Sequence, residues 1–381
     1  MRVLWICSLP SAVQQFPLEG VDHGAQVALP WVLAHFPPPD RLDLEIACLW
    51  PGGTHRKKVE FQGVFFHLVP CPRRGRALLF FQKDLSYFRP LFDELKPDIV
   101  HGWGTEDSFG LVARKLAPFR HVIGIQGLVT EYRRKIPLEK RTILTGITER
   151  LTLRFARWVV AESNYSLGVT RRLCPRAEMY VIEHPLRPEF LEAEPSNGQA
   201  RRVVYIGLID ERKGISDAVA AFAQAAPDDW SLHVIGKGVP EKEEAMLRQV
   251  KDAGIGARFT HDRSLSSPEL VAAMQNGSIF LLPTRIDTGP TALKESLAMG
   301  LWPVCYDNSG PAEYIRKFGF GSLARDEDPA DLTATLRKAI ETEPWKDERL
   351  RQKLRKATRT AFSREEIWPQ LQSLYAHIAS R

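Results

Sequence analysis

Short β-branched or apolar runs alternate with longer amphipathic stretches along almost the whole chain, and this alternation constrains the fold more than any other feature. It is the pattern of βαβ units, in which helices cover the faces of a parallel sheet. It predicts an α/β protein built from doubly wound, Rossmann-like sheets. The predicted strands are 3–8, 44–49, 64–69, 98–103, 121–126, 158–162 and 179–183 in the first half, and 202–207, 231–236, 257–261, 278–283 and 302–307 in the second.

Two helix starts are predicted between the early strands. One helix begins near Gly24, and Pro30 is expected to kink or shorten it. Another covers residues 108–116, with Asp107 as its N-cap.

The alternation is interrupted by turn-forming residues at 185–188 and again at 194–198. A chain of 381 residues also suits two medium-sized domains better than one core. We therefore expect a first Rossmann-like domain over 1–190, a linker over 191–201, and a second Rossmann-like domain over 202–362.

The end of the chain carries a helix signal of its own. Ser363 and Glu366 have the spacing of a capping box before the amphipathic run 367–378. We expect a terminal helix within 363–381 that packs back on the first domain.

The composition, with 44% hydrophobic and 26% charged residues, is that of an ordinary globular protein rather than a disordered one. The apolar run at residues 3–7 is too short for a signal peptide, and no later run approaches the roughly 20 apolar residues of a membrane span. These patterns predict a cytoplasmic protein.

A net charge of +6 favours acidic partners, and nucleotide sugars, anionic lipids and nucleic acid all qualify. The basic clusters at 73–76, 133–135 and 171–172 lack the aromatic interleaving of a single-strand binding platform, so no nucleic acid is expected. A solvated face is the first interpretation of these clusters. Peripheral contact with an anionic membrane at its inner face is the second.

Metal and disulfide chemistry find little support in the sequence. The five cysteines are scattered, odd in number and without a Cys-x-x-Cys pair. The one Asp-x-Asp string, from Asp326 to Asp328, precedes Pro329 and is interpreted as the cap of the next helix. We expect a site with no metal and no cofactor.

A candidate phosphate site follows the predicted strand 203–207, where Lys213 and Gly214 precede a helical run. Amides at a helix N-terminus carry partial positive charge, and Lys213 adds a full charge at the edge where open α/β sheets bind ligands. An isolated Lys-Gly before a helix is also typical of an exposed lysine. A second site is needed to support the first.

That second site follows the strand 278–283, where a turn leads into another helix. Pro290 is expected at the first helical position and Gly289 at the cap. This arrangement leaves the amides of Thr291 and Ala292 for an anion or a sugar hydroxyl.

Two carboxylates flank this turn. Asp287 precedes it, and Glu295 lies about one helical turn beyond it. Carboxylates accept paired hydrogen bonds from the vicinal hydroxyls of a ribose or a hexose. Each acid could instead cap the helix or pair with Lys294 or Arg285, and the residues alone leave both interpretations open.

Together the two sites resemble those of the large retaining glycosyltransferase family of GT-B fold, which includes sucrose and trehalose-phosphate-type synthases. In the family's paired-acid motif two glutamates stand eight positions apart, and Asp287 and Glu295 keep this spacing, since 295 minus 287 is 8. The resemblance implies two Rossmann-like domains facing a central cleft. It is carried by Gly207, Lys213, Gly214, 232–236, Asp287, Glu295 and 298–304.

The resemblance also implies roles for individual residues. Lys213 would bind the donor diphosphate, Glu295 the ribose, and Asp287 the transferred sugar. Lys213, Arg212 and Asp287 form the implied catalytic set, in which Asp287 is not assigned as a nucleophile. The implied donor-binding set is Gly24, Gly207, Lys213, Asp287, Gly289, Pro290, Thr291, Ala292 and Glu295.

The sequence departs from the family pattern at three places. Leu208 stands where the family has an arginine on the diphosphate, and Arg212 is the candidate substitute. Asp287 is one methylene shorter than the usual glutamate, and Gly289 is shifted from the usual glycine position. The identity of the donor sugar is therefore left open.

In the first domain, the loop 20–25 resembles the family's glycine-containing loop near the donor phosphates and the acceptor. His23 from this loop, with Trp103 and Gln126 at the ends of two predicted strands, forms the expected acceptor side. Gln126 stands where the family often has histidine. A core tryptophan and a turn glutamine are the alternative interpretations.

The resemblance implies transfer of a sugar from a UDP-, GDP- or ADP-sugar to a hydroxyl of a glycan, a lipid or a small molecule, with retention and without metal. Such a reaction belongs to polysaccharide or glycolipid biosynthesis. Leu208 and Gln126 keep open an alternative, a catalytically degenerate regulatory or scaffold subunit that binds sugar nucleotides. An epimerase or phosphorylase would need acid/base residues or a cofactor lysine, and a dehydrogenase a Gly-x-Gly-x-x-Gly after a strand; we locate none of these.

Overall fold

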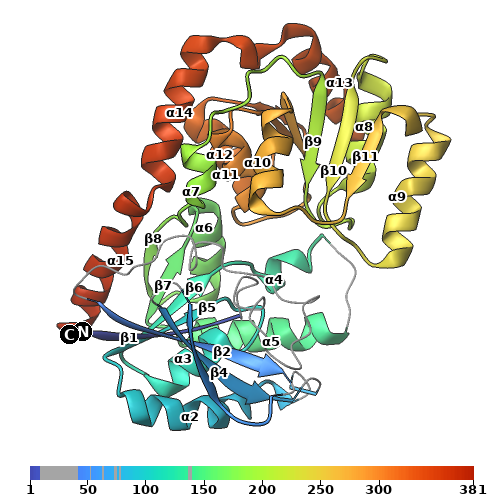
Figure 1. Cartoon of the computed structure of the whole chain (residues 1–381). Helices are drawn as coiled ribbons and strands as arrows, with labels where there is room; N and C mark the ends of the chain where they lie inside the picture. The colour runs from blue at the N-terminus through green and yellow to red at the C-terminus, as the bar shows by residue number, and fades with distance from the viewer. Residues whose placement is uncertain (9–41, 52, 62–63, 73–74, 77–78, 136–139) are drawn as a thin grey trace. The chain divides into compact units, whose positions relative to one another are not determined.

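The chain forms two compact α/β units, shown in Figure 1. The first consists of Met1–Arg187 with Arg364–Arg381, and the second of Pro188–Ser363. Each unit is Rossmann-like, with helices connecting the strands of one predominantly parallel sheet, and the predicted fold class is confirmed. This computed structural model describes residues 1–8, 42–51, 53–61, 64–72, 75–76, 79–135 and 140–381.

Among the described residues, the first unit holds an eight-stranded sheet in the order β3-β4-β2-β1-β5-β6-β7-β8. Neighbouring strands are parallel except β3, which is antiparallel to β4. The strands are β1 (Arg2–Cys7), β2 (Asp43–Pro51), β3 (Lys57–Phe61), β4 (Val64–Cys71), β5 (Ile99–Trp103), β6 (His121–Ile125), β7 (Trp158–Ala161) and β8 (Glu178–Val181). The helices are α2 (Asp84–Leu95), α3 (Phe109–Leu116), α4 (Val129–Tyr132), α5 (Lys140–Arg154), α6 (Asn164–Leu173) and α15 (Arg364–Ala379).

The seven strands predicted for the first half all form, with ends within two residues of the prediction. The edge strand β3 was not predicted, because Lys57, Lys58 and Glu60 give it no apolar pattern. The N-cap of α3 is Ser108, so the prediction of Asp107 is wrong. The Asp107 carboxylate instead accepts from the Ser108 amide and from Arg76, while the helix predicted near Gly24 lies outside the described residues.

Strand β1 is buried on both faces, so its side chains alternate between two hydrophobic clusters. Leu4 and Ile6 pack with residues of α2 and α3. Trp5 points to the other face, where it packs with Trp368 and Tyr375 of α15. The last helix of the chain is therefore part of the core of the first unit.

Aromatic stacking and hydrogen bonds hold α15 against the sheet. The rings of Trp5 and Trp368 are stacked, with centroids 5.7 Å apart. The Trp5 indole N–H donates to the Tyr375 hydroxyl at 3.0 Å, and this hydroxyl lies 2.6 Å from Nδ1 of His101. Burial, reinforced by the nearby His184, holds the pKa of His101 well below its ordinary value, so Nδ1 can accept the tyrosine proton.

The described second unit contains a six-stranded parallel sheet in the order β11-β10-β9-β12-β13-β14. The strands are β9 (Arg202–Ile206), β10 (Ser231–Ile235), β11 (Phe259–Asp262), β12 (Ile279–Leu282), β13 (Trp302–Tyr306) and β14 (Ser322–Ala324). The helices are α7 (Pro188–Glu192), α8 (Ile215–Ala225), α9 (Pro240–Asp252), α10 (Ser267–Gln275), α11 (Thr291–Ala298), α12 (Ser309–Phe318), α13 (Pro329–Thr342) and α14 (Glu348–Phe362), with 3-10 turns η3 (Gly256–Arg258) and η4 (Pro344–Lys346).

All five strands predicted for the second half form, and only the three-residue strand β14 was missed. The strand order is that of a doubly wound sheet, in which the direction of winding reverses between β9 and β12. The carboxyl ends of these two strands therefore form the position where such sheets bind ligands.

Residues 191–201, predicted as a linker, are built into the second unit. Ser196 donates from its amide to the Met299 carbonyl at 2.9 Å and from its hydroxyl to the Gly277 carbonyl at 2.5 Å. The buried indole of Trp345 donates to the Gly198 carbonyl at 3.0 Å. These contacts satisfy the polar backbone of the segment, and the division between the units falls between Arg187 and Pro188.

Within the described part of the chain, no helix combines the length and the apolar character needed to cross a bilayer. The five cysteines are all buried free thiols.

Replacing Tyr375 with Phe should lower the free energy of unfolding by about 1–3 kcal/mol, because the buried Trp5 and His101 each lose a hydrogen-bond partner. Tyr180→Phe is the control, since its hydroxyl lies at the surface, 3.5 Å from Glu178. Urea denaturation followed by tryptophan fluorescence measures both. An equal loss in the two variants would contradict the role given to the buried hydroxyl.

Candidate functional site

The candidate site lies in the second unit, where two loops leave the adjacent strands β9 and β12. The loop after β9 leads into α8, whose N-cap is Gly214. The loop after β12 leads into α11, whose N-cap is Pro290. Both helices therefore direct the positive ends of their dipoles toward the carboxyl edge of the sheet.

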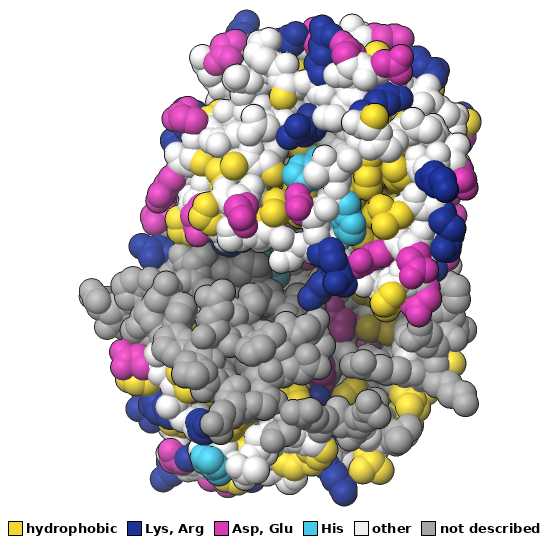
Figure 2. All heavy atoms as spheres, turned by 45° about the vertical axis from the view of Figure 1, so that its right-hand side comes forward, with side chains coloured by type: hydrophobic (Ala, Val, Ile, Leu, Met, Phe, Trp, Pro, Cys, Tyr) yellow, Lys and Arg dark blue, Asp and Glu magenta, His cyan; other side chains and the backbone are white. Residues whose placement is uncertain are grey.

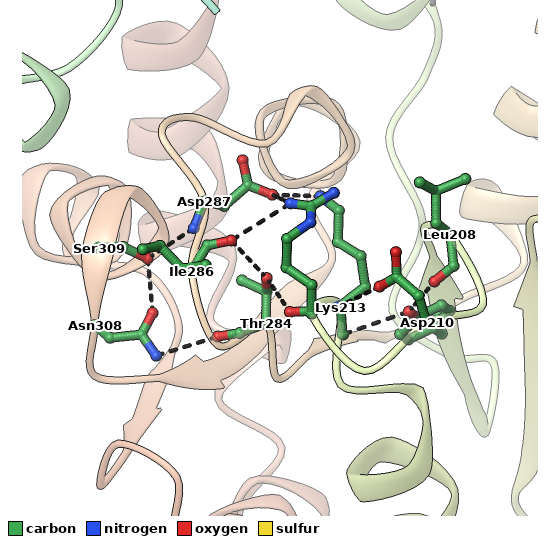
Figure 3. A network of polar contacts seen from close by, with 10 residues as sticks. Leu208, Asp210, Lys213, Thr284, Ile286, Asp287, Asn308 and Ser309 are labelled. Atoms are coloured by element: carbon green, nitrogen blue, oxygen red, sulfur yellow. Dashed lines mark hydrogen bonds and ion pairs between the residues drawn. The ribbon is translucent and has the colours of Figure 1, made fainter. Parts of the chain in front are cut away.

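The loop after β9 is shaped by the buried side chain of Tyr205. Its hydroxyl donates to the Leu208 carbonyl at 2.9 Å and approaches the Lys213 carbonyl at 3.4 Å. Asp210 accepts from the Lys213 amide at 2.8 Å, which closes the turn from the other side. These bonds set the direction in which the Lys213 side chain leaves the loop (Figure 3).

The two loops are in direct backbone contact. Gly214 has a φ of +71°, and a Cβ at this position would lie 2.0 Å from the Pro283 carbonyl oxygen, so only glycine fits. The Arg212 carbonyl accepts from the Arg285 amide and from the Thr284 hydroxyl, both at 2.9 Å. The positions of Arg212 and Lys213 are thereby tied to the end of β12.

Two cations meet one carboxylate at this junction, as Figure 3 shows. Lys213 Nζ forms an ion pair with Asp287, and Arg212 Nη1 lies 3.6 Å from the same carboxylate oxygen. The side chains are mostly buried, with exposures of 15% for Lys213, 17% for Arg212 and 9% for Asp287. These three groups sum to a formal charge of +1, and the Asp210 carboxylate, which accepts from the Lys213 amide, lies in the same loop.

Opposing effects act on the pKa of Asp287. Burial raises this pKa, but the charges of Lys213 and Arg212, with hydrogen bonds from Lys213 and the Gly289 amide, outweigh burial. The net shift is downward, so the carboxylate is ionised at neutral pH.

The backbone of Asp287 is held by the start of α12. Its amide donates to the Ser309 hydroxyl at 3.1 Å, and its carbonyl accepts from the Gly310 amide at 2.9 Å. The Ser309 hydroxyl donates to Asn308 at 2.7 Å, and the Asn308 amide donates to the Thr284 carbonyl at 3.1 Å. The sequence analysis missed this support.

A sequence signal for this support exists. The string from Asn308 to Pro311 begins two residues after the end of β13 and has the residues of a helix start. Because β13 is the parallel neighbour of β12, its carboxyl end lies beside the loop that carries Asp287.

The start of α11 differs from the prediction by one residue. Pro290 is the N-cap rather than the first helical residue, because its ψ of 118° is extended and its carbonyl accepts from the Leu293 and Lys294 amides. Gly289 is not the cap, since its amide bonds the Asp287 carboxylate instead. Thr291 and Ala292, in the first turn of α11, are half-exposed.

The second acid of the pair, Glu295, is buried in α11 with 3% exposure. Its neighbour Lys294 is fully buried, with the ammonium group 5.5 Å from the centre of the Tyr314 ring and 5.8 Å from that of Phe362. The sequence left open a pairing of Asp287 with Lys294 or with Arg285. In the structure its ion pairs are with Lys213 and Arg212 instead.

Gly207, also predicted to bind the donor, lies where β9 and β10 approach closely. Its amide donates to the Ile235 carbonyl at 3.1 Å. A Cβ on Gly236 would lie 1.8 Å from the Gly207 carbonyl oxygen, so the two chains touch at the backbone. Gly24, also predicted to bind the donor, lies outside the described residues.

Of the predicted acceptor side in the first unit, His23 lies outside the described residues. The Trp103 ring is 1% exposed and stacks on His101 with centroids 3.8 Å apart, which is the placement of a core tryptophan. Gln126 is half-buried at the carboxyl end of β6. The sequence analysis missed Glu106, which packs against the backbone of Gly127, the residue after Gln126. A Cβ on Gly127 would lie 2.0 Å from the Glu106 carboxylate.

The interpretation of the Asp-x-Asp string as a helix cap is confirmed. Asp328 is the N-cap of α13, and its carboxylate accepts from the Asp331 amide at 3.0 Å, with Pro329 at the first helical position. Asp326 accepts from the Asn308 side chain at 2.5 Å.

Comparison with known proteins identifies the family. Residues 187–361 match the family described as glycosyl transferases group 1, and residues 39–190 match glycosyltransferase family 4. The two matches together span residues 39–361, and the chain belongs to the glycosyltransferases that combine these two parts. The resemblance to glycosyltransferases found in the sequence is thereby confirmed.

Among curated proteins, this glycosyltransferase-family chain is similar to the glycogen synthase of Anaeromyxobacter sp. (strain Fw109-5). The two are 26% identical over 293 residues, which cover 74% of this chain and 57% of that protein. The chain spans from 29% to 57% of the lengths of the first four curated relatives that it matches.

Solved structures share the fold. Sucrose-phosphate synthase from Thermosynechococcus elongatus superposes with a TM-score of 0.80 at 16% identity, over 100% of this chain and 99% of that one. HepE from Anabaena, in complex with UDP-glucose, superposes with a TM-score of 0.72 at 12% identity, over 99% of this chain and 100% of that one. These likenesses show the GT-B fold.

Asp287→Asn should destabilise the second unit by up to about 3 kcal/mol, because it leaves two mostly buried cations without their anion. A carboxylate with a lowered pKa stabilises the fold above the ordinary carboxyl pKa of about 4, and this contribution is lost as the pH falls through the lowered value. The gap between wild type and variant should therefore narrow toward acid pH.

Urea denaturation between neutral pH and about pH 3 measures this gap. Asp331→Asn, at a half-exposed carboxylate of the same unit, is the control. A gap for Asp287→Asn that does not change with pH would contradict an ionised Asp287.

Proposed function

We propose that this protein transfers a sugar from a nucleotide-diphosphate donor to an acceptor hydroxyl, with retention of anomeric configuration and without a metal. The donor would bind in the second unit at the carboxyl ends of β9 and β12. The observation that carries this proposal is the junction of Lys213, Arg212 and Asp287, which come from two loops on either side of the reversal in strand order.

The cations at this junction match the chemistry of the reaction. Cleavage of the bond between the sugar and the diphosphate leaves negative charge on the departing oxygen, which positioned cations stabilise best in a mostly buried site. Lys213 would exchange its ion pair with Asp287 for the diphosphate, and Arg212 would follow. The amides at the starts of α8 and α11 add partial positive charge.

The same exchange gives Asp287 a role. Once Lys213 turns to the phosphate, the Asp287 carboxylate becomes available to accept from hydroxyls of the transferred sugar. Glu295, one turn along α11 from Thr291, would accept from the ribose hydroxyls.

Retention would follow from attack by the acceptor hydroxyl on the face of the sugar that the diphosphate leaves. The new bond joins the acceptor oxygen to the anomeric carbon, the bond from that carbon to the phosphate oxygen breaks, and the acceptor proton passes to the phosphate. No protein nucleophile is assigned to this step. The acceptor would be a glycan, a lipid or a small molecule.

The position of Arg212 supports an active enzyme. Leu208, in the place of the family's arginine, is 46% exposed. Arg212 nevertheless reaches the junction, with its guanidinium 3.6 Å from Asp287. The cation missing at one position of the chain is therefore present at another. The exposed Leu208, in place of an arginine, is the observation that favours the second candidate, a binding subunit without catalysis. The experiment below therefore distinguishes the two.

Thermal unfolding with UDP-glucose, GDP-mannose and ADP-glucose tests the donor site. We expect one nucleotide class to raise the melting temperature, since a ligand at 100 times its Kd stabilises the native state by about 2.7 kcal/mol. Lys213→Met and Glu295→Gln should each weaken binding by at least about tenfold, a change of about 1.4 kcal/mol.

Lys242→Met is the matched control, because Lys242 also pairs with an acid but lies exposed, 3.0 Å from Glu211. Acceptor-dependent release of the nucleoside diphosphate then tests transfer. Binding without release would favour the binding subunit. The absence of any shift, or equal losses in Lys213→Met and Lys242→Met, would contradict the proposed donor site.

A further inference from the structure

Helix α5 of the first unit presents apolar side chains to solvent. Ile147 is 40% exposed and Leu151 is 50% exposed, and Phe155, directly after the helix, is 59% exposed. Because they recur every four residues, these three side chains form one stripe along the helix. A surface helix of a globular protein normally turns such a stripe toward the core.

The buried face of α5 is largely polar instead, although Leu153 near its end is fully buried in the core. Thr145, Thr148, Glu149 and Thr152 are each less than 5% exposed. The Glu149 carboxylate accepts from three donors: the Val129 amide at 3.0 Å, the Thr130 amide at 2.7 Å and the Thr105 hydroxyl at 2.8 Å.

These bonds hold the start of α4 and determine which side of α5 faces inward. The apolar stripe is left outside as a consequence.

Arginines flank the stripe. Arg150 and Arg154 are exposed between its members, and the guanidinium groups of Arg114 and Arg154 lie 5.5 and 5.9 Å from the centre of the Phe155 ring. We call Ile147, Arg150, Leu151, Arg154 and Phe155 the α5 face.

A second exposed aromatic side chain, like Phe155, lies next to an arginine. Phe119, in the loop between α3 and β6, is 72% exposed, and the guanidinium of Arg157 lies 5.9 Å from its ring centre. The Arg157 amide donates at 3.1 Å to Nε2 of His121, the first residue of β6, whose Nδ1 lies 2.9 Å from the Ala117 carbonyl, so the His121 ring links the two loops.

No exposed carboxylate accompanies these side chains within the described stretches 108–135 and 140–161. The acids there are Glu131 and Glu149, with exposures of 6% and 0%. By contrast, acidic and basic side chains are intermixed on the part of the second unit visible in Figure 2. The exposed charged side chains of these two stretches are therefore all basic, whereas Glu178, which is 45% exposed, borders them through a hydrogen bond from its amide to the Arg157 carbonyl at 2.9 Å.

We propose that the α5 face docks on the surface of an anionic lipid bilayer. Ile147, Leu151 and Phe155 would enter the boundary between headgroups and acyl chains, and the arginines would contact lipid phosphates. Charge favours this occupant over a second copy of the chain, because a two-fold contact would place arginines against arginines. The proposal goes beyond the proposed function and does not depend on donor binding or transfer.

Co-sedimentation of the full chain with vesicles tests the proposal. The vesicles are phosphatidylcholine alone or phosphatidylcholine with phosphatidylglycerol. We expect binding to the anionic vesicles, weakened by salt, and a loss of at least about tenfold in Leu151→Glu, which removes an apolar side chain and adds a negative charge.

Leu247→Glu is the matched control, because Leu247 is 47% exposed on α9 but has Glu244 and Glu241 on the same helix. It should bind the vesicles as wild type does. Since both leucines are half-exposed, far-ultraviolet circular dichroism should show unchanged folding in both variants.

Two results would overturn the proposal. One is equal vesicle binding by Leu151→Glu and wild type, or no preference for anionic vesicles. The other is a wild-type protein that does not bind vesicles but forms a dimer in sedimentation velocity, with the dimer lost in Leu151→Glu. That result would make the α5 face a contact between copies.

Discussion

The ion pair between Lys213 and Asp287 joins the two loops on which the second unit's site depends. The residues are 74 positions apart in the chain, and they meet because β9 and β12 are neighbours in the sheet. A mostly buried carboxylate needs compensation for its lost hydration, which Lys213, Arg212 and a backbone amide provide. The glycine at 214 permits the close backbone contact that brings these groups together. The junction thus holds two cations and one carboxylate that come from different loops.

Polar satisfaction also shapes the first unit, with a different outcome at its surface. The hydroxyl of Tyr375 links Trp5 to His101 and fixes α15 against the sheet, so the end of the chain completes the core begun by β1. In α5, Glu149 is drawn inward because its carboxylate satisfies amides at the start of α4. In α15 the hydrogen bonds accompany the burial of an apolar face, whereas in α5 they bring a polar face inward. The exposed stripe of α5 is the consequence of that difference.

The strands were predictable because the signal for a buried parallel strand is local. Runs such as β9 and β12 are apolar over their whole length and are bounded by turn formers, so a short window of sequence contains the evidence. The edge strand β3 escaped because charged residues suit an edge and break the apolar pattern. The caps of α3 and α11 were each placed one residue too early. The Asp107 carboxylate is engaged by Arg76, which lies 31 positions away, and the Gly289 amide by the Asp287 carboxylate two positions earlier.

The sequence by itself determined the two series of strands, the loops at their carboxyl ends, and the spacing of eight between Asp287 and Glu295. These features depend on residue type and on short-range periodicity. Only the tertiary structure decided that Asp287 pairs with Lys213 rather than with Arg285, that Ser309 and Asn308 support it, and that α5 turns its threonines inward. Such choices depend on strand order and on which buried polar group finds a partner, and neither is contained in any local stretch of the chain.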